Sequence, residues 1–475
     1  MKLSRQIFHG VLLSNVVTIV EMAVGFTQHI ILVRFLLGIK EFGTLGFFQA
    51  GFGILAIFFN LNLNNSAIRF GGASVAKKDE TEFYAIQGTA FLLTVLLNLV
   101  LLGVTLVFSA IGFEYKERVV GDYYFLLALN SLANLPGGFA NTLFTTRKEF
   151  RRLTVQQIMS TVIGAICMLA VTAHYRNVRG AMIGMITASC VVSLISLWMV
   201  RKDLFRLRIN FKLTRSFSTY GGGFALTSIV KQFFWNADVV LLGLFTNEKV
   251  VGLYRIAQTV ANPLMRVFSP LWTVLFPTVA IESASGNVDP IRKLLTRGTQ
   301  WLVLGNLPIV IVGCYLLDFV IPRVYGGAVG AIFPIRLLLW GYVIGTMTAV
   351  SPPVLRVYRN DLAFLTTFLA AILNILLNLI LIPELRIIGA ALSSLISFGL
   401  LALAVHFYAF RAAGLPVVKE LTFGVGVQIA LIGLMMIASI FNHVWIALSL
   451  YGVLLLFLFG YKMVSISELK TYVAS

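Results

Sequence analysis

The chain has few charged residues, few cysteines and few histidines, and each scarcity excludes a class of function. Only 12% of its 475 residues are charged, against about a quarter in soluble domains. The three cysteines are odd in number and lie in apolar runs, so they predict no disulfide framework. No His/Cys cluster has metal-ligand spacing, and no GxxxxGKS/T motif is present. We therefore expect no catalytic residue, no metal site, no bound cofactor and no direct use of ATP.

What the chain has in abundance is apolar sequence, with 59% hydrophobic residues. About 20 consecutive apolar residues cross a bilayer, and fourteen such spans are expected, which predicts an all-α polytopic membrane protein. The first run is read as a retained helix because another span follows it, with no cleavage site between them. The expected spans are 7–37, 43–66, 84–111, 119–145, 153–173, 178–200, 217–245, 249–281, 293–316, 331–357, 360–382, 387–410, 418–441 and 443–463.

Basic residues are unevenly distributed over the connections between these spans. Most of them lie in connections on the side of the membrane that also holds both termini, and the segment 201–217 is the densest. Because cytoplasmic loops retain Lys and Arg, both termini are predicted to be cytoplasmic, in a bacterial inner membrane. The net charge of +18 then reflects topology and attraction to the anionic lipids of the bilayer, so we expect no nucleic-acid partner.

The sequence carries an internal repeat, revealed by a shift of 209 residues. KEFGTLGFFQ at 40–49 aligns with KVVGLYRIAQ at 249–258, and the shift also pairs Arg147 with Arg356 and Gly180 with Gly389. Six helices per repeat is an even number, so both copies enter the membrane in the same direction. We expect two parallel six-helix lobes, residues 1–205 and 206–411, followed by two helices and a tail at 412–475. This arrangement is typical of transporters whose site lies between the lobes.

Ionisable residues inside spans are costly, so those present usually face a cavity or a partner. Positive groups outnumber negative ones there, which favours an anionic substrate such as a phosphate. Residues nearer helix ends, Arg34, Arg323 and Arg336, are expected to extend to the interface. The candidate cavity cations are Arg69, Lys231, Arg255 and Arg266; the candidates for ion coupling are Glu21, Asp238 and His29, which the 209-residue shift places opposite Asp238.

The stretch NPLMRVFSPLWTVLFPTV, residues 262–279, has prolines at 263, 270 and 277 around Arg266. Interior prolines kink helices and free backbone carbonyls, which membranes tolerate beside a cavity or neighbouring helices. We expect a bent helix that presents Arg266 to a wet interior. The alternative is a kinked packing helix with Arg266 paired to a carboxylate such as Asp238.

Three runs, LVRFLLGIKEFGTLGFFQA, NADVVLLGLFTNEKVVGLYRIAQTVANPL and LFPTVA, resemble the polysaccharide transporter family, the Wzx-type flippases of the multidrug, oligosaccharidyl-lipid and polysaccharide (MOP) superfamily. The resemblance covers the twelve-helix core. It implies a fold similar to that of lipid II flippases and multidrug and toxin exporters. It also implies a substrate, an oligosaccharide linked to undecaprenyl pyrophosphate, that moves from the inner to the outer leaflet by alternating access.

The resemblance further implies roles for single residues and partners. Lipid II flippases carry cavity arginines on their first, second and eighth helices, and the nearest counterparts here are Arg34, Arg69 and either Arg255 or Arg266. Glu21 could match the coupling carboxylate that exporters keep on the first helix. The expected cargo is an O-antigen or exopolysaccharide repeat unit, with a polysaccharide polymerase and a chain-length regulator as partners.

Two other functions remain open at this point. One is a multidrug exporter of the same fold, coupled to a proton or sodium gradient. The other is a membrane enzyme acting on lipid-linked sugars, which needs a sizeable outer loop for its catalytic residues; here no outer loop exceeds roughly twenty residues.

Overall fold

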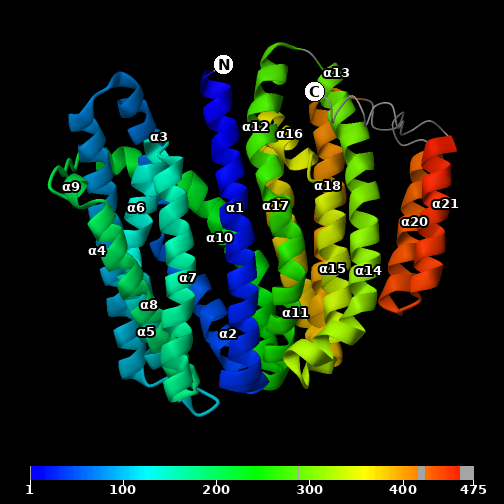
Figure 1. The fold of residues 1–475 in the computed structure, drawn as a ribbon, viewed down its shortest axis with the longest axis horizontal. Coiled ribbons are helices and arrows are strands. Elements are labelled where there is room, and N and C mark those ends of the chain that lie inside the picture. The colour runs from blue at the N-terminus through cyan, green and yellow to red at the C-terminus, as the bar shows by residue number, and fades with distance from the viewer. Residues whose placement is uncertain (1, 287, 416–422, 461–475) are drawn as a thin grey trace. The chain divides into compact units, whose positions relative to one another are not determined.

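The computed structural model of the chain is almost entirely helical (Figure 1) and describes residues 2–286, 288–415 and 423–460. By internal packing it divides into two compact units, Met1–Gly252 and Leu253–Ser475, called unit 1 and unit 2 below. The lobe boundaries expected at 205/206 and 411/412 stay predictions, and the tail from 461 lies outside the described residues.

Unit 1 contains the first six expected spans and the helix that follows the basic connector. Its second span is interrupted at residues 57–62 and its fourth at Asn134, where two helices meet. Its elements are α1 (Lys2–Ile31), the π-helix η1 (Leu32–Leu37), α2 (Gly38–Ala56), the 3-10 helix η2 (Ile57–Phe59), α3 (Leu63–Lys77), α4 (Glu80–Ile111), the hairpin β1 (Glu114–Tyr115) and β2 (Arg118–Val119), α5 (Val120–Ala133), α6 (Leu135–Thr146), α7 (Phe150–Tyr175), α8 (Val178–Met199), α9 (Arg201–Leu204) and α10 (Leu213–Phe245).

Unit 2 contains the rest of the second repeat and the helices that follow it, because α10, the first helix of that repeat, lies in unit 1. The helix α11 (Glu248–Val267) starts at the end of unit 1 and continues into unit 2. The remaining elements are α12 (Ser269–Ala284), α13 (Asp289–Lys293), the π-helix η3 (Leu294–Gly298), α14 (Thr299–Tyr325), the 3-10 helix η4 (Ala328–Ala331), α15 (Ile332–Met347), α16 (Ser351–Tyr358), α17 (Asn360–Leu385), α18 (Ile387–Ala412), α20 (Phe423–Ile440) and α21 (Val444–Gly460).

The helix that carries the three prolines was expected to bend, and the structure interrupts it. It ends as α11 at Val267 and restarts as α12 at Ser269, with Phe268 between them. Pro263 lies inside α11, and Pro270 lies in the first turn of α12, where a missing N–H costs nothing. Shifted by 209 residues, Phe59 at the end of η2 becomes Phe268, so both repeats interrupt their second span at the same place.

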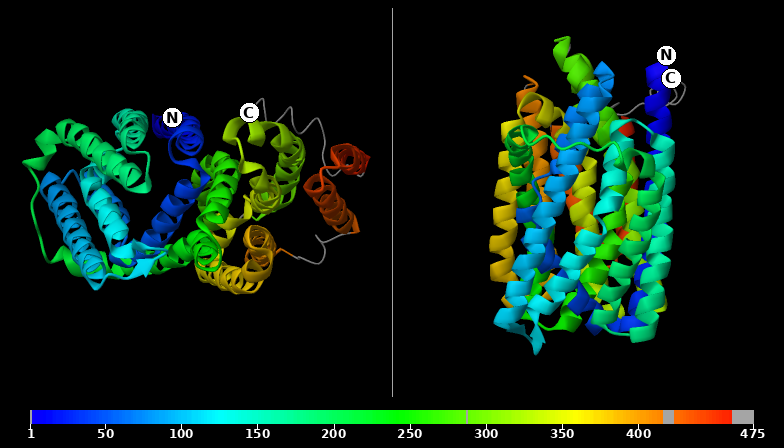
Figure 2. Two further views of the ribbon diagram at one scale, coloured as in Figure 1. Left: turned by 90° about the horizontal axis from the view of Figure 1, so that it is seen from below. Right: turned by 90° about the vertical axis from the view of Figure 1, so that its left-hand side faces the viewer.

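The connector between α9 and α10 lies along α4 and extends as a trace before α10 begins (Figure 2). The backbone N–H of Arg208 donates to the carbonyl of Tyr84 at 3.4 Å, and the N–H of Asn210 donates to Oγ1 of Thr89 at 2.9 Å. A side chain at Gly88 would overlap the carbonyl oxygen of Arg208. Because Gly88 has no side chain, the backbone of this basic segment packs directly against α4.

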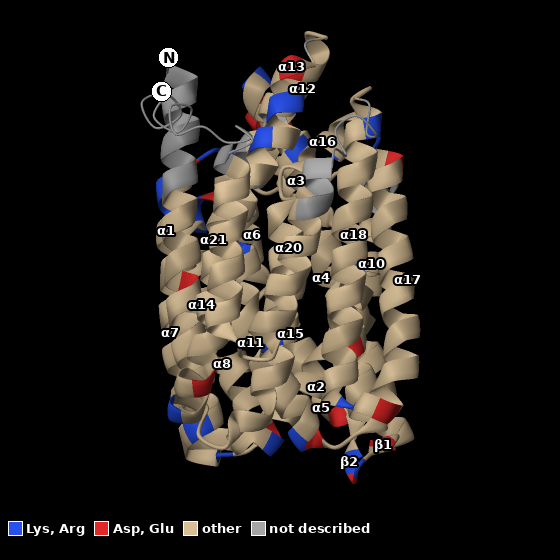
Figure 3. Cartoon of the chain, turned by 90° about the vertical axis from the view of Figure 1, so that its right-hand side faces the viewer, with Lys and Arg blue, Asp and Glu red and all other residues tan. Residues whose placement is uncertain are grey.

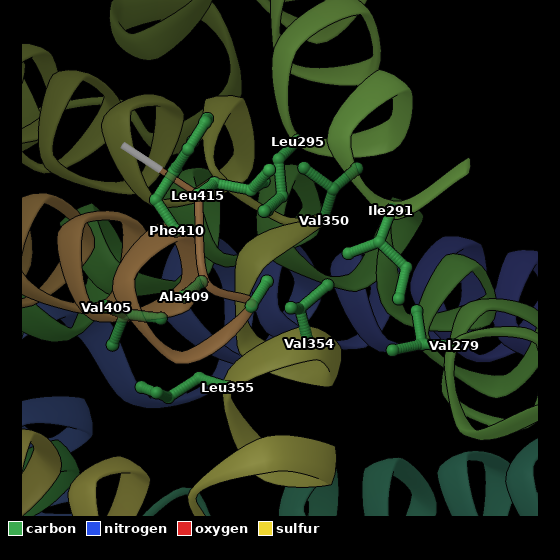
Figure 4. Packing of buried hydrophobic residues seen from close by; sticks show 11 residues of the cluster. Val279, Ile291, Leu295, Val350, Val354, Leu355, Val405, Ala409, Phe410 and Leu415 are labelled. Carbon is green, nitrogen blue, oxygen red and sulfur yellow. The ribbon is translucent and has the colours of Figure 1, made fainter. Parts of the chain in front are cut away.

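Hydrophobic cores hold the ends of the helices together in each unit. In unit 2, α12, α13, η3, α16 and α18 meet in one cluster (Figure 4), built on fully buried residues such as Leu295, Val354 and Leu355. Charged residues lie mostly toward helix ends, and the middles of the helices are mostly uncharged (Figure 3). Among the described residues, nine helical runs are long and apolar enough to cross a membrane. The chain is therefore a polytopic helical membrane protein, and the total of fourteen spans stays a prediction.

Candidate functional site

The predicted site residues of unit 1 lie on four helical segments. Arg34 is exposed in η1, Arg69 is exposed on α3 and Lys231 is exposed on α10. Asp238, two turns beyond Lys231, is 3% exposed, and its Oδ1 accepts a hydrogen bond from the N–H of Val239 at 2.8 Å. Lys231 and Asp238 therefore differ sharply in burial although they share a helix.

Two further predicted residues of unit 1, Glu21 and His29, are half-buried on α1. The imidazole of His29 lies edge-on to the ring of Phe42 on α2, with centroids 5.5 Å apart. Their roles in ion coupling stay predictions.

The predicted site residues of unit 2 both lie on α11. Arg255 is half-buried and donates to Oε1 of Gln258 at 3.2 Å. Arg266 is exposed, two residues before the interruption at Phe268. The structure thus places Arg266 beside a helix break, and the binding roles of Arg255 and Arg266 stay predictions.

The interpretation of Arg336 as an interfacial residue is wrong. Its side chain is 7% exposed, and its Nη2 lies 2.7 Å from Oδ2 of Asp318 on α14. It also donates to the carbonyls of Cys314 and Ile440, and Asn442 donates to the same carboxylate oxygen at 2.7 Å. Its partner carboxylate lies on the neighbouring helix and is 44% exposed, and sequence spacing alone did not reveal this pair. Arg336 therefore ties α14 and α15 to the turn after α20.

A polar cavity of about 210 Å³ lies inside unit 1 between η2, α3, α4, α5 and α6. Both interrupted spans border it. Asn60 and Asn64 flank the break before α3, and Asn134 stands at the junction of α5 and α6. Asn62, in the same break, has the left-handed φ of 52° and donates to Oγ of Ser228 at 2.7 Å. The cavity thus lies beside the unwound segment that precedes α3 and beside the junction of α5 and α6, each near the middle of its span.

The hydrogen-bonding capacity of this cavity is only partly used. Ser131 donates to Oδ1 of Asn98 at 2.8 Å, and Asn98 donates to the carbonyl of Thr94 at 2.9 Å. Gln87 is 1% exposed, and its Oε1 has no hydrogen-bond partner among the described residues. Asn64 and Asn134 are exposed and line the cavity, and their side-chain amides form no hydrogen bond with any described residue. Amide donors and acceptors are therefore available to a ligand.

Sequence reasoning missed this cavity, although a signal was present. The segment FFNLNLNNS, residues 58–66, places four asparagines in an otherwise apolar span. Asparagine competes for backbone hydrogen bonds and tolerates left-handed backbone, so such a cluster favours a break over a continuous helix. The expected span 43–66 is therefore interrupted, and its hydropathy did not predict this break.

A second feature of unit 1 is a close crossing of two repeat-related glycines, Gly43 on α2 and Gly252 on α11. A Cβ at Gly43 would lie 2.5 Å from the backbone nitrogen of Gly252 and would overlap the carbonyl oxygen of Glu248. A Cβ at Gly252 would overlap the carbonyl oxygen of Ile39. The two backbones therefore touch at the end predicted to face outside.

The hairpin β1–β2 clamps the same end of unit 1. Nη2 of Arg118 lies 2.8 Å from Oε1 of Glu41 on α2, and Nζ of Lys116 donates to the carbonyl of Thr246 at the end of α10. The ring of Tyr115 stacks on Phe47 of α2, with centroids 4.3 Å apart. Burial alone would lower the pKa of Arg118, but the hydrogen bond to Glu41 raises it above its usual value. The hairpin thus joins α2 to α10.

The fold matches solved membrane transporters. A lipid II flippase, MurJ, in an inward closed conformation aligns with a TM-score of 0.68 and 13% identity over 95% of this chain and 100% of that one. An inward-facing multidrug resistance MATE family transporter of the MOP superfamily aligns with a TM-score of 0.62 and 13% identity over 85% of this chain and 96% of that one. These likenesses show that the chain has the fold of these transporters.

The family follows from the sequence. Residues 7–281, more than half of the chain, match the model described as polysaccharide biosynthesis protein. The chain belongs to this family, and the resemblance to polysaccharide transporters is confirmed.

Two curated relatives come from Haloferax volcanii. The probable flippase AglR is 26% identical over 259 residues, which are 50% of this chain and 51% of that protein. The probable low-salt glycan biosynthesis flippase Agl15 is 24% identical over 371 residues, which are 76% of this chain and 75% of that protein. The chain therefore matches about half the length of one relative and three quarters of the other.

Proposed function

We propose that this protein is a flippase that moves a lipid-linked glycan from the inner to the outer leaflet. The observation that carries this proposal is membership of the polysaccharide biosynthesis family together with relatives named as flippases. In finer detail, the cargo is an O-antigen or exopolysaccharide repeat unit on undecaprenyl pyrophosphate. The setting is a bacterial inner membrane, with both termini cytoplasmic and a polymerase and chain-length regulator downstream.

The charges in the spans support an anionic headgroup. Arg69, Lys231, Arg255 and Arg266 outnumber Glu21 and Asp238. Guanidinium and ammonium groups in a low-dielectric setting bind phosphate strongly, which suits a pyrophosphate. The prenyl chain stays in the bilayer, where its apolar surface costs nothing.

Alternating access is the mechanism that we attach to this cargo. The repeat gives two copies of one topology, as in transporters whose halves rock around a central site. The contact of Gly43 with Gly252 and the hairpin clamp close the predicted outer end of unit 1 in this conformation. Opening to the outside requires these contacts to separate. Glu21, Asp238 and His29 are the candidates for coupling this movement to a proton or sodium gradient.

Reconstituted liposomes test the proposal directly. Undecaprenyl-pyrophosphoryl-N-acetylglucosamine is placed in the membrane, and a soluble galactosyltransferase with labelled UDP-galactose reports the lipid that reaches the outer leaflet. We expect protein-dependent labelling that Lys231→Ala and Arg266→Ala abolish. Arg359→Ala is the control, because Arg359 is exposed and paired with Asp361 on a connection. Wild-type labelling by a well-inserted double variant would contradict the cationic site.

A multidrug exporter is the second candidate, favoured by the match to the MATE transporter. It predicts efflux of cationic dyes that depends on Glu21 or Asp238. Unchanged dye sensitivity in cells lacking the protein removes this candidate.

A further inference from the structure

We propose that the polar cavity of unit 1 is a binding subsite for one uncharged sugar ring of the glycan. This inference rests on the proposed function for the source of the sugar. The cavity itself stands on geometry, namely two helix breaks, unused amide groups and the absence of charge.

The first step concerns depth. The cavity lies beside residues 60–64, between α2 and α3, beside residues 87–101 of α4, and at the α5–α6 junction. Each position is near the middle of its span. Interrupted helices at mid-membrane depth are tolerated where they line a cavity, and they present backbone and polar groups to a substrate.

The second step concerns what the amides need. Gln87 Oε1 is buried without a partner, and the amides of Asn64 and Asn134 face the cavity unused. A buried polar group without a partner costs about 1–3 kcal/mol. Each amide offers both donors and an acceptor, which matches the hydroxyl and acetamido groups of a sugar. An acyl chain in the cavity would leave all three groups unsatisfied.

The third step concerns charge. Among the described residues that line the cavity, none carries an ionisable side chain. A phosphate here would lose its hydration without a cation to replace it, and a cation would meet no carboxylate. The ligand that fits is therefore polar and neutral.

The fourth step concerns shape. Phe91 and Phe139 form one wall, with ring centroids 4.8 Å apart, and Phe59 also lines the cavity. Aromatic rings pack against the C–H faces of sugars while amides bind their edges. A cavity volume of about 210 Å³ has room for several waters and suits one sugar ring.

The test measures sugar binding apart from lipid binding. Protein in nanodiscs free of glycosidic detergent is mixed with methyl glycosides of glucose, galactose and N-acetylglucosamine, and binding is followed by saturation-transfer NMR. The variants are Asn64→Leu and Asn134→Leu. Asn65→Leu is the matched control, because Asn65 is the exposed neighbour of Asn64 on α3 and does not line the cavity. We expect at least one glycoside to bind about tenfold more weakly to each cavity variant, the cost of about one hydrogen bond, and unchanged binding to the control.

A second arm uses lipids. Undecaprenyl pyrophosphate and its N-acetylglucosamine derivative are compared by native mass spectrometry. Sugar-dependent binding that both cavity variants lose supports the subsite. Glycoside binding without lipid binding keeps the subsite and refutes the flippase proposal. Glycosides that do not bind the wild-type protein, or that bind the wild-type protein and the cavity variants equally, overturn the subsite whatever the lipids do.

Discussion

The second span of each repeat is broken at the corresponding position, but the two breaks are built differently. In unit 1, η2 is followed by Asn60 and by Asn62 in left-handed backbone, beside a polar cavity. In unit 2, Phe268 alone separates α11 from α12, with a φ of −91° that any residue adopts. One break is polar and requires an unusual backbone conformation, and the other is apolar and set by prolines.

The fourth spans of the two repeats, α5–α6 and α15–α16, are also interrupted in different surroundings. Unit 1 breaks at Asn134, whose amide faces the cavity. Unit 2 breaks at Thr348–Val350, a few residues beyond the position that the shift predicts, and Val350 is buried in the cluster of Figure 4. Duplication thus kept the interruptions, while one copy surrounds them with amides and the other with packed hydrophobic side chains.

The largest expected change in stability comes from placing an amide in the apolar surroundings of unit 2 and an apolar side chain at the amide position of unit 1. Val354→Asn removes a fully buried side chain of unit 2 and buries an amide without a partner, which should lower the free energy of unfolding by about 4 kcal/mol. Asn134→Leu in unit 1 should change it by less than about 0.5 kcal/mol, because this amide is exposed and unbonded. Thermal unfolding in detergent measures both. Equal losses would show that the two breaks are equivalent.

The crossing of Gly43 and Gly252 is a feature that the two repeats share, and substitutions at both glycines test whether they contribute equally to stability. Gly43→Ala and Gly252→Ala each place a methyl group against the partner backbone, so both should destabilise by about 2 kcal/mol. Gly72→Ala on α3 is the control, because a Cβ there meets nothing within 4 Å. Unequal losses at 43 and 252 would argue that only one copy depends on the crossing.

Backbone conformation at the two breaks predicts effects of opposite sign. The Asn62→Gly variant should be about 1 kcal/mol more stable to unfolding than Asn62→Ala, because left-handed backbone is unfavourable for a residue with a Cβ. The Phe268→Ala variant should be about 0.5–1 kcal/mol more stable to unfolding than Phe268→Gly, because the backbone there is in the right-handed helical region. The four variants are compared by unfolding midpoint. The same sign at both sites would remove the distinction between the breaks.

The smallest effect is expected at the hairpin, for which unit 2 has η4 after Gly326 and Gly327 instead. Arg118→Gln removes a partly exposed ion pair with Glu41, a loss of about 0.5–1 kcal/mol at low salt. Screening should shrink this difference in high salt. A loss that is independent of salt would instead assign the effect to packing.

Much of the fold was predictable from hydrophobic length and the repeat. Every expected span overlaps a helix of the described residues, because about twenty apolar residues must form a helix in lipid. The prolines at 263 and 270 predicted a bend in the eighth span, and the structure interrupts the span between them. The break at 57–62 was not predicted because its cause is asparagine chemistry, which hydropathy does not detect.

The site was less predictable than the fold. Deep charges such as Lys231 and Arg266 are visible in the sequence, but what each side chain contacts depends on tertiary packing. Arg336 shows this, since its partner Asp318 lies one helix earlier and reverses the expected placement. The cavity was also not predictable, although for a different reason. Its polar groups are uncharged amides on three spans, and these amides come together only in the folded protein.

The crossing of Gly43 and Gly252 has a consequence for the history of the chain. Each repeat contributes the same residue at the same position, which makes the contact isologous, as in a symmetric homodimer. Two separate half-length chains that each carried this glycine would present matching surfaces for the same contact. Gene fusion would then have had to supply only a linker, because the surface that joins the copies already existed in each of them.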